Sequence, residues 1–168
     1  LFGYSVSIDN DTLVVGAYLE SSDQRTITNG TTAASTDNSM AGTGAVYVYK
    51  RSGSTWTQQA YIKAVNSNVS DNFGRSVSIN NDTLVVGANF EDSSQTTVTN
   101  GTTAASDNDK SASGAVYVFT RNGSGIWAQD AYIKASNNDV DDNFGDVVFV
   151  DGITIGVGAQ LEDSNQTT

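Results

Sequence analysis

Carboxylates are the side chains best suited to chemistry in this sequence, because its 168 residues include no His and no Cys. Asp and Glu outnumber Lys and Arg by 19 to 8, which gives a formal net charge of −11. Without imidazole or thiolate groups, a Ser-His-Asp triad, a Cys-His dyad, a thiolate zinc site and a disulfide are all excluded. Two kinds of chemistry remain: binding of a hard cation and acid–base work by paired carboxylates.

The acidic residues stand at recurring positions. Glu20, Glu91 and Glu162 are each separated by 71 residues, and Asp-Asn pairs occur at the same interval. The candidate metal ligands are Asp71, Asn72, Glu91, Asp92, Asp142, Asn143, Glu162 and Asp163. Calcium takes six to eight oxygen ligands, including backbone carbonyls. Two interpretations therefore stand: a calcium site in each repeat, or a solvated acidic rim in which Asp and Asn cap turns.

Paired carboxylates also raise the alternative of a glycoside hydrolase, with Glu91 and Asp142 as the pair. A catalytic site needs one special constellation, which would break a repeat. These acids instead recur with the repeat, as structural or metal-binding residues do. The sequence therefore predicts a protein that is not an enzyme.

The elements that position these acids come from an internal repeat. The segment FGYSVSIDNDTLVVGA begins at Phe2, FGRSVSINNDTLVVGA at Phe73 and FGDVVFVDGITIGVGA at Phe144, so both offsets are 71 residues. Trp56 and Trp127 keep the same period. Self-similarity at a fixed long period is the signature of a tandem array.

Each repeat predicts four strands and no helix. Residues 2–8 alternate between apolar and polar, residues 12–17 are a short apolar run, residues 45–49 are β-branched and aromatic, and residues 56–64 alternate again. Asn and Gly between the first two strands favour a tight hairpin turn. We predict an all-β fold of β-propeller blades with four antiparallel strands each. An open β-solenoid is the alternative.

The opening Phe-Gly of each repeat, followed about fourteen residues later by Gly-Ala, resembles the FG-GAP repeat. The Gly-Ala-Val-Tyr-Val stretch at Gly44 and Gly114 is similar to the variant of microbial extracellular proteins. The resemblance implies a β-propeller like that of integrin α-subunits. The Pro that follows Gly-Ala in the family is replaced by Tyr18, Asn89 and Gln160. The Asp-rich calcium loop of integrin repeats is reduced to Asp-Asn-Asp at residues 9–11.

The period divides the chain into 2.4 repeats. We predict one blade repeat over residues 1–71, a second over 72–142 and the first two strands of a third over 143–168. A propeller needs at least four blades, so these repeats form an incomplete one, and unpaired edges would remain. We expect a fragment of a longer protein, or several chains that complete a ring or a fibre.

Chain direction places the long inserts between the second and third strands on the same face as the linkers between repeats. We expect ligands on this face, with Tyr18, Glu20, Asn89 and Gln160 as candidate contacts. Arg75 and Asp146 occupy equivalent places in the first strands of neighbouring repeats, so we predict that they pair. The two Trp residues recur with the repeat, which favours packing between blades over ligand stacking.

The inserts repeat their own sequence: residues 27–35 are echoed by residues 98–106. We therefore predict partly ordered inserts, with turns at Asn29-Gly30 and Asn100-Gly101. Asn-X-Ser/Thr sequons offer acceptors for N-linked glycans in a secreted protein. The exposed acceptors are predicted to be Asn29, Asn68, Asn100, Asn122 and Asn165.

Charge and hydropathy restrict the partners. Acidity excludes binding of nucleic acid through its phosphates, and no apolar run is long enough for a membrane span. We predict an extracellular or cell-surface segment that binds a protein or glycan ligand. The structural alternative is a subunit of a surface layer, sheath or fibre that binds further copies of itself.

Overall fold

In the computed structural model, residues 1–31 and 36–163 are described, and every regular element within them is a β-strand. The first repeat contains β1 (Ser5–Asp9), β2 (Thr12–Ala17), β3 (Thr28–Asn29), β4 (Ala45–Ser52) and β5 (Thr55–Ile62). The second contains β6 (Ser76–Asn80), β7 (Thr83–Ala88), β8 (Val98–Asn100), β9 (Ala115–Arg121) and β10 (Trp127–Ile133). The third contains β11 (Phe144–Asp151) and β12 (Thr154–Ala159).

Tight turns join the first two strands of each repeat. Asn10 and Asn81 have φ angles of 50° and 54°, and Gly152 has 58°. Asn and Gly tolerate this left-handed conformation, which matches the twist of the flanking strands. The turns set the register, so that Ser7 lies opposite Val14 and Ser78 opposite Val85. The predicted hairpins are therefore confirmed.

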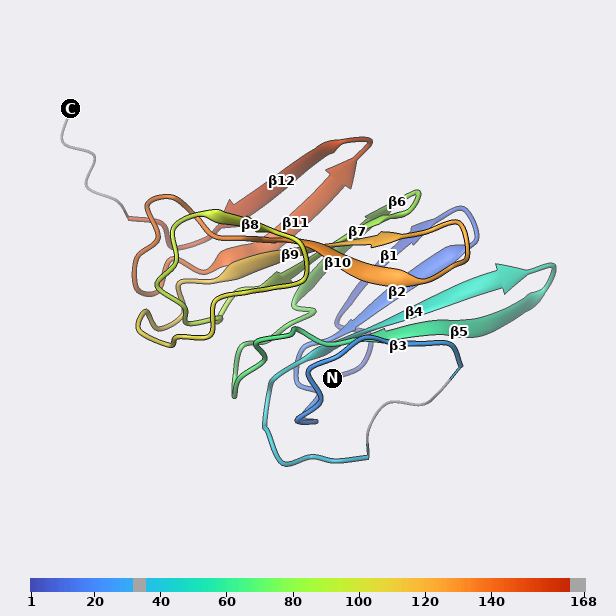
Figure 1. The fold of residues 1–168 in the computed structure, drawn as a ribbon, viewed down its shortest axis with the longest axis horizontal. Coiled ribbons are helices and arrows are strands. Elements are labelled where there is room, and N and C mark those ends of the chain that lie inside the picture. Colours follow the sequence, from blue (N-terminus) through green and yellow to red (C-terminus); the bar gives the residue numbers. More distant parts are fainter. Residues whose placement is uncertain (32–35, 164–168) are drawn as a thin grey trace.

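The strands form antiparallel sheets in the order β1-β2-β4-β5-β3 and β6-β7-β9-β10-β8, followed by the hairpin β11-β12 (Figure 1). Each full sheet thus has five strands rather than the four that were predicted. The fifth, β3 or β8, is two or three residues long and pairs with the outer strand β5 or β10. The insert supplies this strand, so part of each insert is ordered, as predicted.

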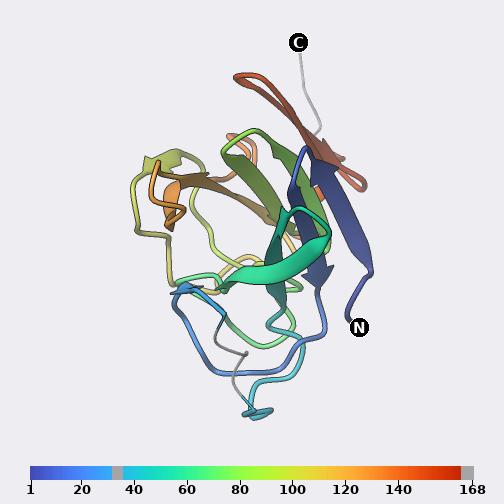
Figure 2. The ribbon, with the colours of Figure 1, turned by 90° about the vertical axis from the view of Figure 1, so that its right-hand side faces the viewer.

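The sheets stack face to face, and Figure 2 shows the hairpins β1–β2, β6–β7 and β11–β12 side by side. Between the two full sheets lies a core that includes Val14, Val48, Phe73, Tyr117 and Trp127. A smaller core around Val85, Val116 and Val148 joins the second sheet to the third hairpin. Successive residues of the strands in the second sheet thus point to opposite faces, and each face packs in a different core.

The contact between two neighbouring repeats is called a seam, and equivalent hydrogen bonds occur in both seams of the chain. Ser5 Oγ donates to the Gly74 carbonyl and Ser76 Oγ to the Gly145 carbonyl, each over 2.8 Å. Two residues further along the same strands, Ser7 Oγ accepts from the Ile79 amide, and Ser78 Oγ accepts from the Val150 amide. The innermost strand of each following repeat is thereby bonded to the preceding one.

One face of the first sheet has no neighbour among the described residues. Phe2, Val6 and Ile8 are 62%, 63% and 62% exposed, whereas their counterparts Phe73, Val77 and Ile79 are at most 8% exposed. This face is called the free first face. The counterparts of its residues in the second repeat lie in the hydrophobic core.

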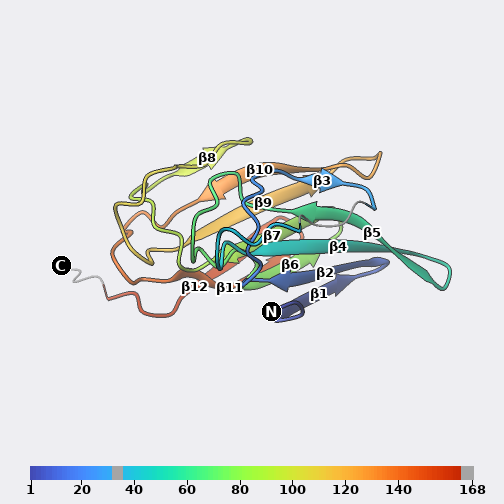
Figure 3. The same cartoon turned by 90° about the horizontal axis from the view of Figure 1, so that it is seen from below.

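All hairpin turns lie at one end of the sheets, at the right in Figure 1, and Figure 3 gives the same arrangement from below. The opposite end carries the inserts after β2 and β7 and the linkers before β6 and β11. The last paired residues of β2 and β4 are Ala17 and Ala45, so the insert leaves the sheet and returns to it at this end. This end is called the insert end.

Candidate functional site

Glu91, one of the predicted metal ligands, is 2% exposed and held by an internal ion pair. Its Oε2 lies 2.8 Å from Lys134 Nζ and accepts from the backbone N–H and the hydroxyl of Ser93. Its Oε1 accepts from Asn66 Nδ2 over 3.0 Å. Burial lowers the pKa of Lys134, and Glu91 opposes that shift by favouring the ammonium ion. Both carboxylate oxygens of Glu91 are therefore engaged by the protein itself.

The same network recurs in the first repeat, where Lys63 Nζ lies 2.8 Å from Glu20 Oε2 and also donates to Thr43 Oγ1. Neither lysine was among the residues predicted from the sequence to form a site. The available signal was the repeated Tyr-Ile-Lys-Ala, in which a Lys keeps the 71-residue period inside an apolar run. Glu162, in the third repeat, accepts a hydrogen bond from Asn137. Glu20 and Glu91 thus anchor the inserts to the ends of the outer strands, whereas Glu162 contacts the linker.

Asp71 and Asp142 close the turns of the linkers. Each is 1% exposed, and each Oδ2 accepts a 2.7 Å hydrogen bond, from the amides of Asn68 and Asp139 respectively. The other carboxylate oxygen, Oδ1, has no hydrogen-bond partner in either residue. Asn72 and Asn143 follow in left-handed conformation, with φ angles of 61° and 56°. Glu91 and Asp142, the pair considered for hydrolysis, are both buried.

Within residues 1–31 and 36–163, no three acidic side chains converge on a position that would hold a metal ion. Both carboxylate oxygens of Glu91 are already hydrogen-bonded within the protein. Asp92 Oδ1 accepts a hydrogen bond from the Ala112 amide, and Asp163 is exposed. The buried side-chain oxygens without a hydrogen-bond partner are Asp71 Oδ1 and Ser67 Oγ at the first linker, and Oδ1 of Asn138, Asp142 and Asn143 at the second. Each set is smaller than the six to eight oxygens that calcium takes. The calcium site stays a prediction.

We expect Asp71 to make stability depend on pH. Burial raises its pKa to about 8, and the charges of Glu91 and Asp92 contribute to the rise against Lys134 and the Asn68 amide. Its ordinary value is about 3.9. The stabilisation is full below pH 4 and lost as the pH rises through 8. Asp71→Asn should remove this slope and raise stability at pH 8 by up to about 5 kcal/mol, measured by urea unfolding from pH 4 to 9.

Asp130→Asn, an exposed carboxylate on β10, is the control and should leave the slope unchanged. An unchanged slope in Asp71→Asn would contradict the assignment. A melting temperature that rises with millimolar CaCl2 in the natural chain, and not in Asp71→Asn, would instead establish Asp71 as a calcium ligand.

The insert end contains a surface hollow of about 370 Å³. It is lined by Ser70, Phe90, Asp92, Ser111, Ala112, Asp141, Asn143 and Leu161, and is called the acidic hollow. Phe90 and Leu161 are 42% and 57% exposed and give it apolar walls. Ser70, Ala112, Asp141 and Asn143 all have positive φ angles. Such strained positions gather at binding sites more often than elsewhere.

The polar side chains of the acidic hollow offer acceptors. Asp141 is exposed and presents its carboxylate to solvent. Asn143 is 6% exposed, and its Oδ1 has no hydrogen-bond partner although its Nδ2 donates to the Asp141 carbonyl. Lys110, the cation of the adjoining insert, is turned away to the Asn138 carbonyl and the Asp139 carboxylate. The hollow is thus arranged for a ligand that donates hydrogen bonds and carries positive charge.

The predicted ligand contacts differ in accessibility. Tyr18 packs edge-on against Tyr4, and both rings lie beneath the guanidinium of Arg75 at 5.4 and 4.6 Å. Asn89 is buried and donates to Asp146 Oδ1, which also pairs with Arg75 Nε at 3.3 Å. The predicted pairing of Arg75 with Asp146 is confirmed. Glu20 pairs with Lys63 as described above. Gln160 is exposed.

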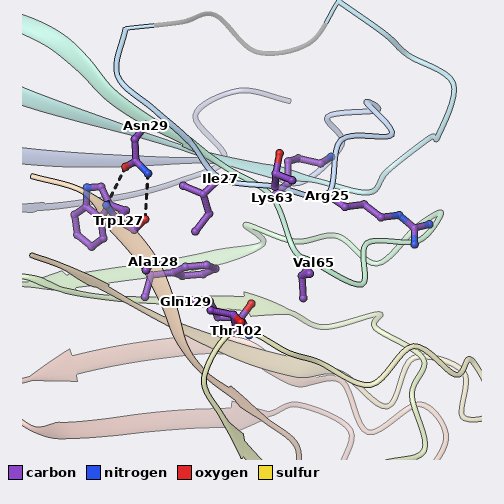
Figure 4. Close-up of a pocket in the computed structure, with 11 residues that line it drawn as sticks. Arg25, Ile27, Asn29, Lys63, Val65, Thr102, Trp127, Ala128 and Gln129 are labelled. Carbon is purple, nitrogen blue, oxygen red and sulfur yellow. Dashed lines mark hydrogen bonds between the residues drawn. The ribbon is translucent and has the colours of Figure 1, made fainter.

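A second cavity, of about 310 Å³, lies between the insert of the first repeat and the outer strand of the second (Figure 4). Ile27, Val65, Phe119 and Trp127 supply its apolar walls. Asn29 bridges the gap: its Nδ2 donates to the Trp127 carbonyl and its Oδ1 accepts from the Trp127 amide. Trp127 is 1% exposed, so the predicted packing between blades is confirmed for this residue. Trp56 is 39% exposed and lies beneath the guanidinium of Arg51, so it does not pack between the described repeats.

Asn29→Ala should remove both bonds across this seam and lower the free energy of unfolding by about 1–2 kcal/mol. Asn100 occupies the same repeat position, is exposed and has no neighbouring repeat to bridge among the described residues. Asn100→Ala is therefore the matched control and should stay within about 0.5 kcal/mol. Equal losses in the two variants, measured by urea unfolding, would show that the bridge contributes nothing.

The predicted glycan acceptors also differ in their exposure. Asn100 and Asn122 are exposed, and Asn122 uses only Oδ1, which accepts from the amides of Ser124 and Ile126. Asn29 and Asn68 are half-buried, and Asn29 Nδ2, the atom that a glycan would modify, is committed to Trp127. Asn165 and the insert residues 32–35 lie outside the described residues. N-glycosylation stays a prediction.

Stacked antiparallel sheets built from one repeated unit, with all long connections at one end, define a β-propeller-type repeat protein. The family model of the FG-GAP repeat matches residues 1–49 and 56–119, and the chain belongs to this family. FG-GAP repeats are typical of extracellular or surface proteins and generally serve binding or structural roles without catalysis. No curated protein matches the chain. None of the described residues forms a helix that could cross a membrane.

Proposed function

We propose that this chain is a non-catalytic extracellular segment that binds a positively charged ligand at its insert end. Its units are the repeats 1–71 and 72–142 and the partial repeat 143–168. The acidic hollow carries the proposal: it combines the Asp141 carboxylate, the unpartnered Asn143 Oδ1 and the half-exposed rings and methyl groups of Phe90 and Leu161. A Lys or Arg side chain of a surface protein supplies both the charge and an apolar stem for such a site.

The internal ion pairs support this role. Glu91 and Lys134 fasten the insert to β10, and Ser113 Oγ bonds to the carbonyls of Glu91 and Ser93. The backbone around the hollow is thereby fixed before any ligand arrives. A rigid site loses less entropy when it binds than a mobile loop does.

Fluorescence anisotropy with a labelled octalysine peptide at 150 mM NaCl tests the proposal. The natural chain should bind, and Asp141→Asn should raise Kd about tenfold, because one charge-assisted hydrogen bond is lost. Asp130→Asn has the same change of charge away from the hollow and should leave Kd within about twofold. Equal weakening by the two variants would show attraction to net charge only.

A glycan remains the other candidate ligand. A glucosamine hexamer carries ammonium groups, whereas its N-acetylated form is neutral. Binding of the cationic hexamer alone, with the same sensitivity to Asp141→Asn, would identify an amino sugar as ligand. Addition of CaCl2 or EDTA to the same titration tests the predicted calcium site.

The structural alternative, a subunit of a surface layer, sheath or fibre, is favoured by one observation. The free first face exposes Phe2, Val6 and Ile8, which are apolar residues at positions buried in the second repeat. Association of copies through this face leaves the insert end open for a ligand.

A further inference from the structure

We propose that the chain has a second binding site, for an acidic glycan, in a groove between the outer strands of its first and second repeats. The groove consists of the cavity of about 310 Å³ shown in Figure 4 and a hollow of about 410 Å³. Asn29 lines both, and together they are called the outer groove. Both walls of the groove belong to the two five-stranded sheets. This site goes beyond cation binding at the insert end and does not depend on it.

The charge of the outer groove is opposite to that of the chain as a whole. Six of the eight Lys and Arg side chains pair with an Asp or Glu. In the part of the chain that the structure describes, only Arg25 and Lys50 lack an acidic partner, and Arg25 lines the cavity whereas Lys50 lines the hollow. None of the residues that line the outer groove is acidic, whereas two Asp residues line the acidic hollow. The outer groove is therefore suited to an anion.

The residues that give the outer groove this character break the repeat. Each part of the groove combines one unpaired cation with one aliphatic side chain, Arg25 with Val65 and Lys50 with Ile126. The two aliphatic side chains are 39% and 45% exposed. The four equivalent positions of the other repeat hold hydroxyl residues, in the same order Thr96, Ser136, Thr120 and Thr55. Packing residues recur with the repeat, whereas a recognition site is needed once, so these exchanges indicate recognition.

An amide of fixed orientation adds a hydrogen-bond donor beside Lys50. Gln59 Oε1 accepts from Trp127 Nε1 over 3.1 Å and from Arg121 Nη1 over 3.0 Å, which settles which end of the amide carries the oxygen. A Cβ at Gly125 would lie 3.1 Å from Gln59 Nε2, so the donor stands next to a residue without a side chain. Both Gln59 and Gly125 line the hollow of Lys50. This part of the groove thus suits a ligand that accepts hydrogen bonds.

The lining of the outer groove favours a sugar that carries carboxylates. Thr26, Thr57 and Thr102 supply hydroxyl groups, and the aliphatic side chains offer a surface to the C–H faces of sugar rings. Figure 4 places Arg25 at the end of the cavity away from Trp127, with its guanidinium directed outward. A guanidinium binds a carboxylate through two parallel N–H···O bonds. A glycan of uronic acids combines hydroxyls, apolar ring faces and carboxylates, and it is the ligand class that we assign.

An acidic peptide fits the outer groove less well. Peptides that bind along a strand use its free backbone groups. The amide and the carbonyl of Trp127, on β10, are already bonded to the Asn29 side chain. The outer edge of β5 is paired with β3 at Ala60 and Tyr61. The groove therefore offers side chains in place of free backbone, which suits the hydroxyls and carboxylates of a glycan.

Isothermal titration calorimetry with hexagalacturonate at 150 mM NaCl and 1 mM EDTA tests the proposal. The natural chain should bind the hexamer, and the fully methyl-esterified hexamer should not bind, because its carboxylates are neutralised. EDTA removes calcium, which would otherwise bridge carboxylates of the glycan and of the chain. A chain of net charge −11 repels a polyanion, so binding requires a local site.

Arg25→Gln and Lys50→Gln should each raise the Kd for hexagalacturonate at least about tenfold, because each removes a charge-assisted hydrogen bond. Arg51→Gln is the matched control, since it loses the same charge at a residue that pairs with Asp11 and lines neither part of the groove. Its Kd should stay within about twofold of that of the natural chain. Arg25 is exposed, so the urea unfolding curve of Arg25→Gln should overlay that of the natural chain.

Three results would overturn the proposal: no binding at 1 mM hexagalacturonate, equal binding of the methyl-esterified hexamer, or equal weakening by Arg25→Gln and Arg51→Gln. A hexaglutamate peptide that binds more tightly than hexagalacturonate, with the same sensitivity to Arg25→Gln, would reject the glycan and assign the groove to an acidic peptide. Octalysine should bind Arg25→Gln as it binds the natural chain, so the outer groove and the acidic hollow are tested separately.

Discussion

Lys134→Ala should lower the free energy of unfolding by about 3–5 kcal/mol, because it strands the Glu91 carboxylate in the interior. The two side chains are 0% and 2% exposed, and Lys134 Nζ also donates to Ser113 Oγ. At this degree of burial, we expect water to compensate little for the lost ammonium group. Urea unfolding followed by tryptophan fluorescence measures the loss.

Two variants control this result. Lys63→Ala breaks the equivalent pair in the first repeat, where the Glu20 side chain is 13% exposed, so water offsets part of its loss. Arg51→Ala breaks the exposed pair with Asp11 and should cost less than about 1 kcal/mol. The expected order is Lys134, then Lys63, then Arg51. A Lys134→Ala variant no less stable than Arg51→Ala would refute the buried pair.

Gly87→Ala should destabilise the chain by about 3 kcal/mol or more, because the new methyl group meets backbone that cannot yield. Its Cβ would lie 1.9 Å from the Gly145 oxygen and 2.4 Å from Ser76 Oγ, so the seam between β6–β7 and β11–β12 must open. Hydrogen exchange should then become faster at Val148 and Val150, which the seam buries.

Gly158→Ala is the matched control, since it makes the same substitution at the same repeat position without a clash. Its unfolding curve should overlay that of the natural chain. A comparable loss in both variants would attribute the effect to strand propensity and not to the seam.

Much of the fold follows from local sequence. Alternation over the first strand, the Asn turns at residues 10 and 81, and the 71-residue period predict the hairpins and their stacking, because each is set by neighbouring residues. β3 and β8 were not predicted as strands. They hold two and three residues of a Thr-rich insert, too few for an apolar pattern, and they exist because the outer strand offers an edge.

The site was harder to predict, because an acidic side chain can contact a ligand only if it is exposed and not already paired within the protein. Glu91 recurs with the period like a ligand, yet Lys134 occupies it, and no sequence spacing reveals that contact. Asp141 was overlooked because its counterpart in the preceding repeat is Ser70, so it does not recur. Asp141 and Asn143 reach the acidic hollow only through the left-handed turn of the linker. The pairing of Arg75 with Asp146 was predictable, since equivalent positions in stacked repeats become neighbours.

The central claim is that ligand binding is localised at the insert end, and a polycation would bind a chain of net charge −11 wherever its surface is acidic. Hydrogen–deuterium exchange of the chain with saturating octalysine at 150 mM NaCl therefore gives the most direct test. We predict protection in residues 89–93, 110–112 and 139–143, which surround the acidic hollow, and none at the turns around Asn81 and Gly152. Uniform protection, or protection centred on those turns, would contradict the account.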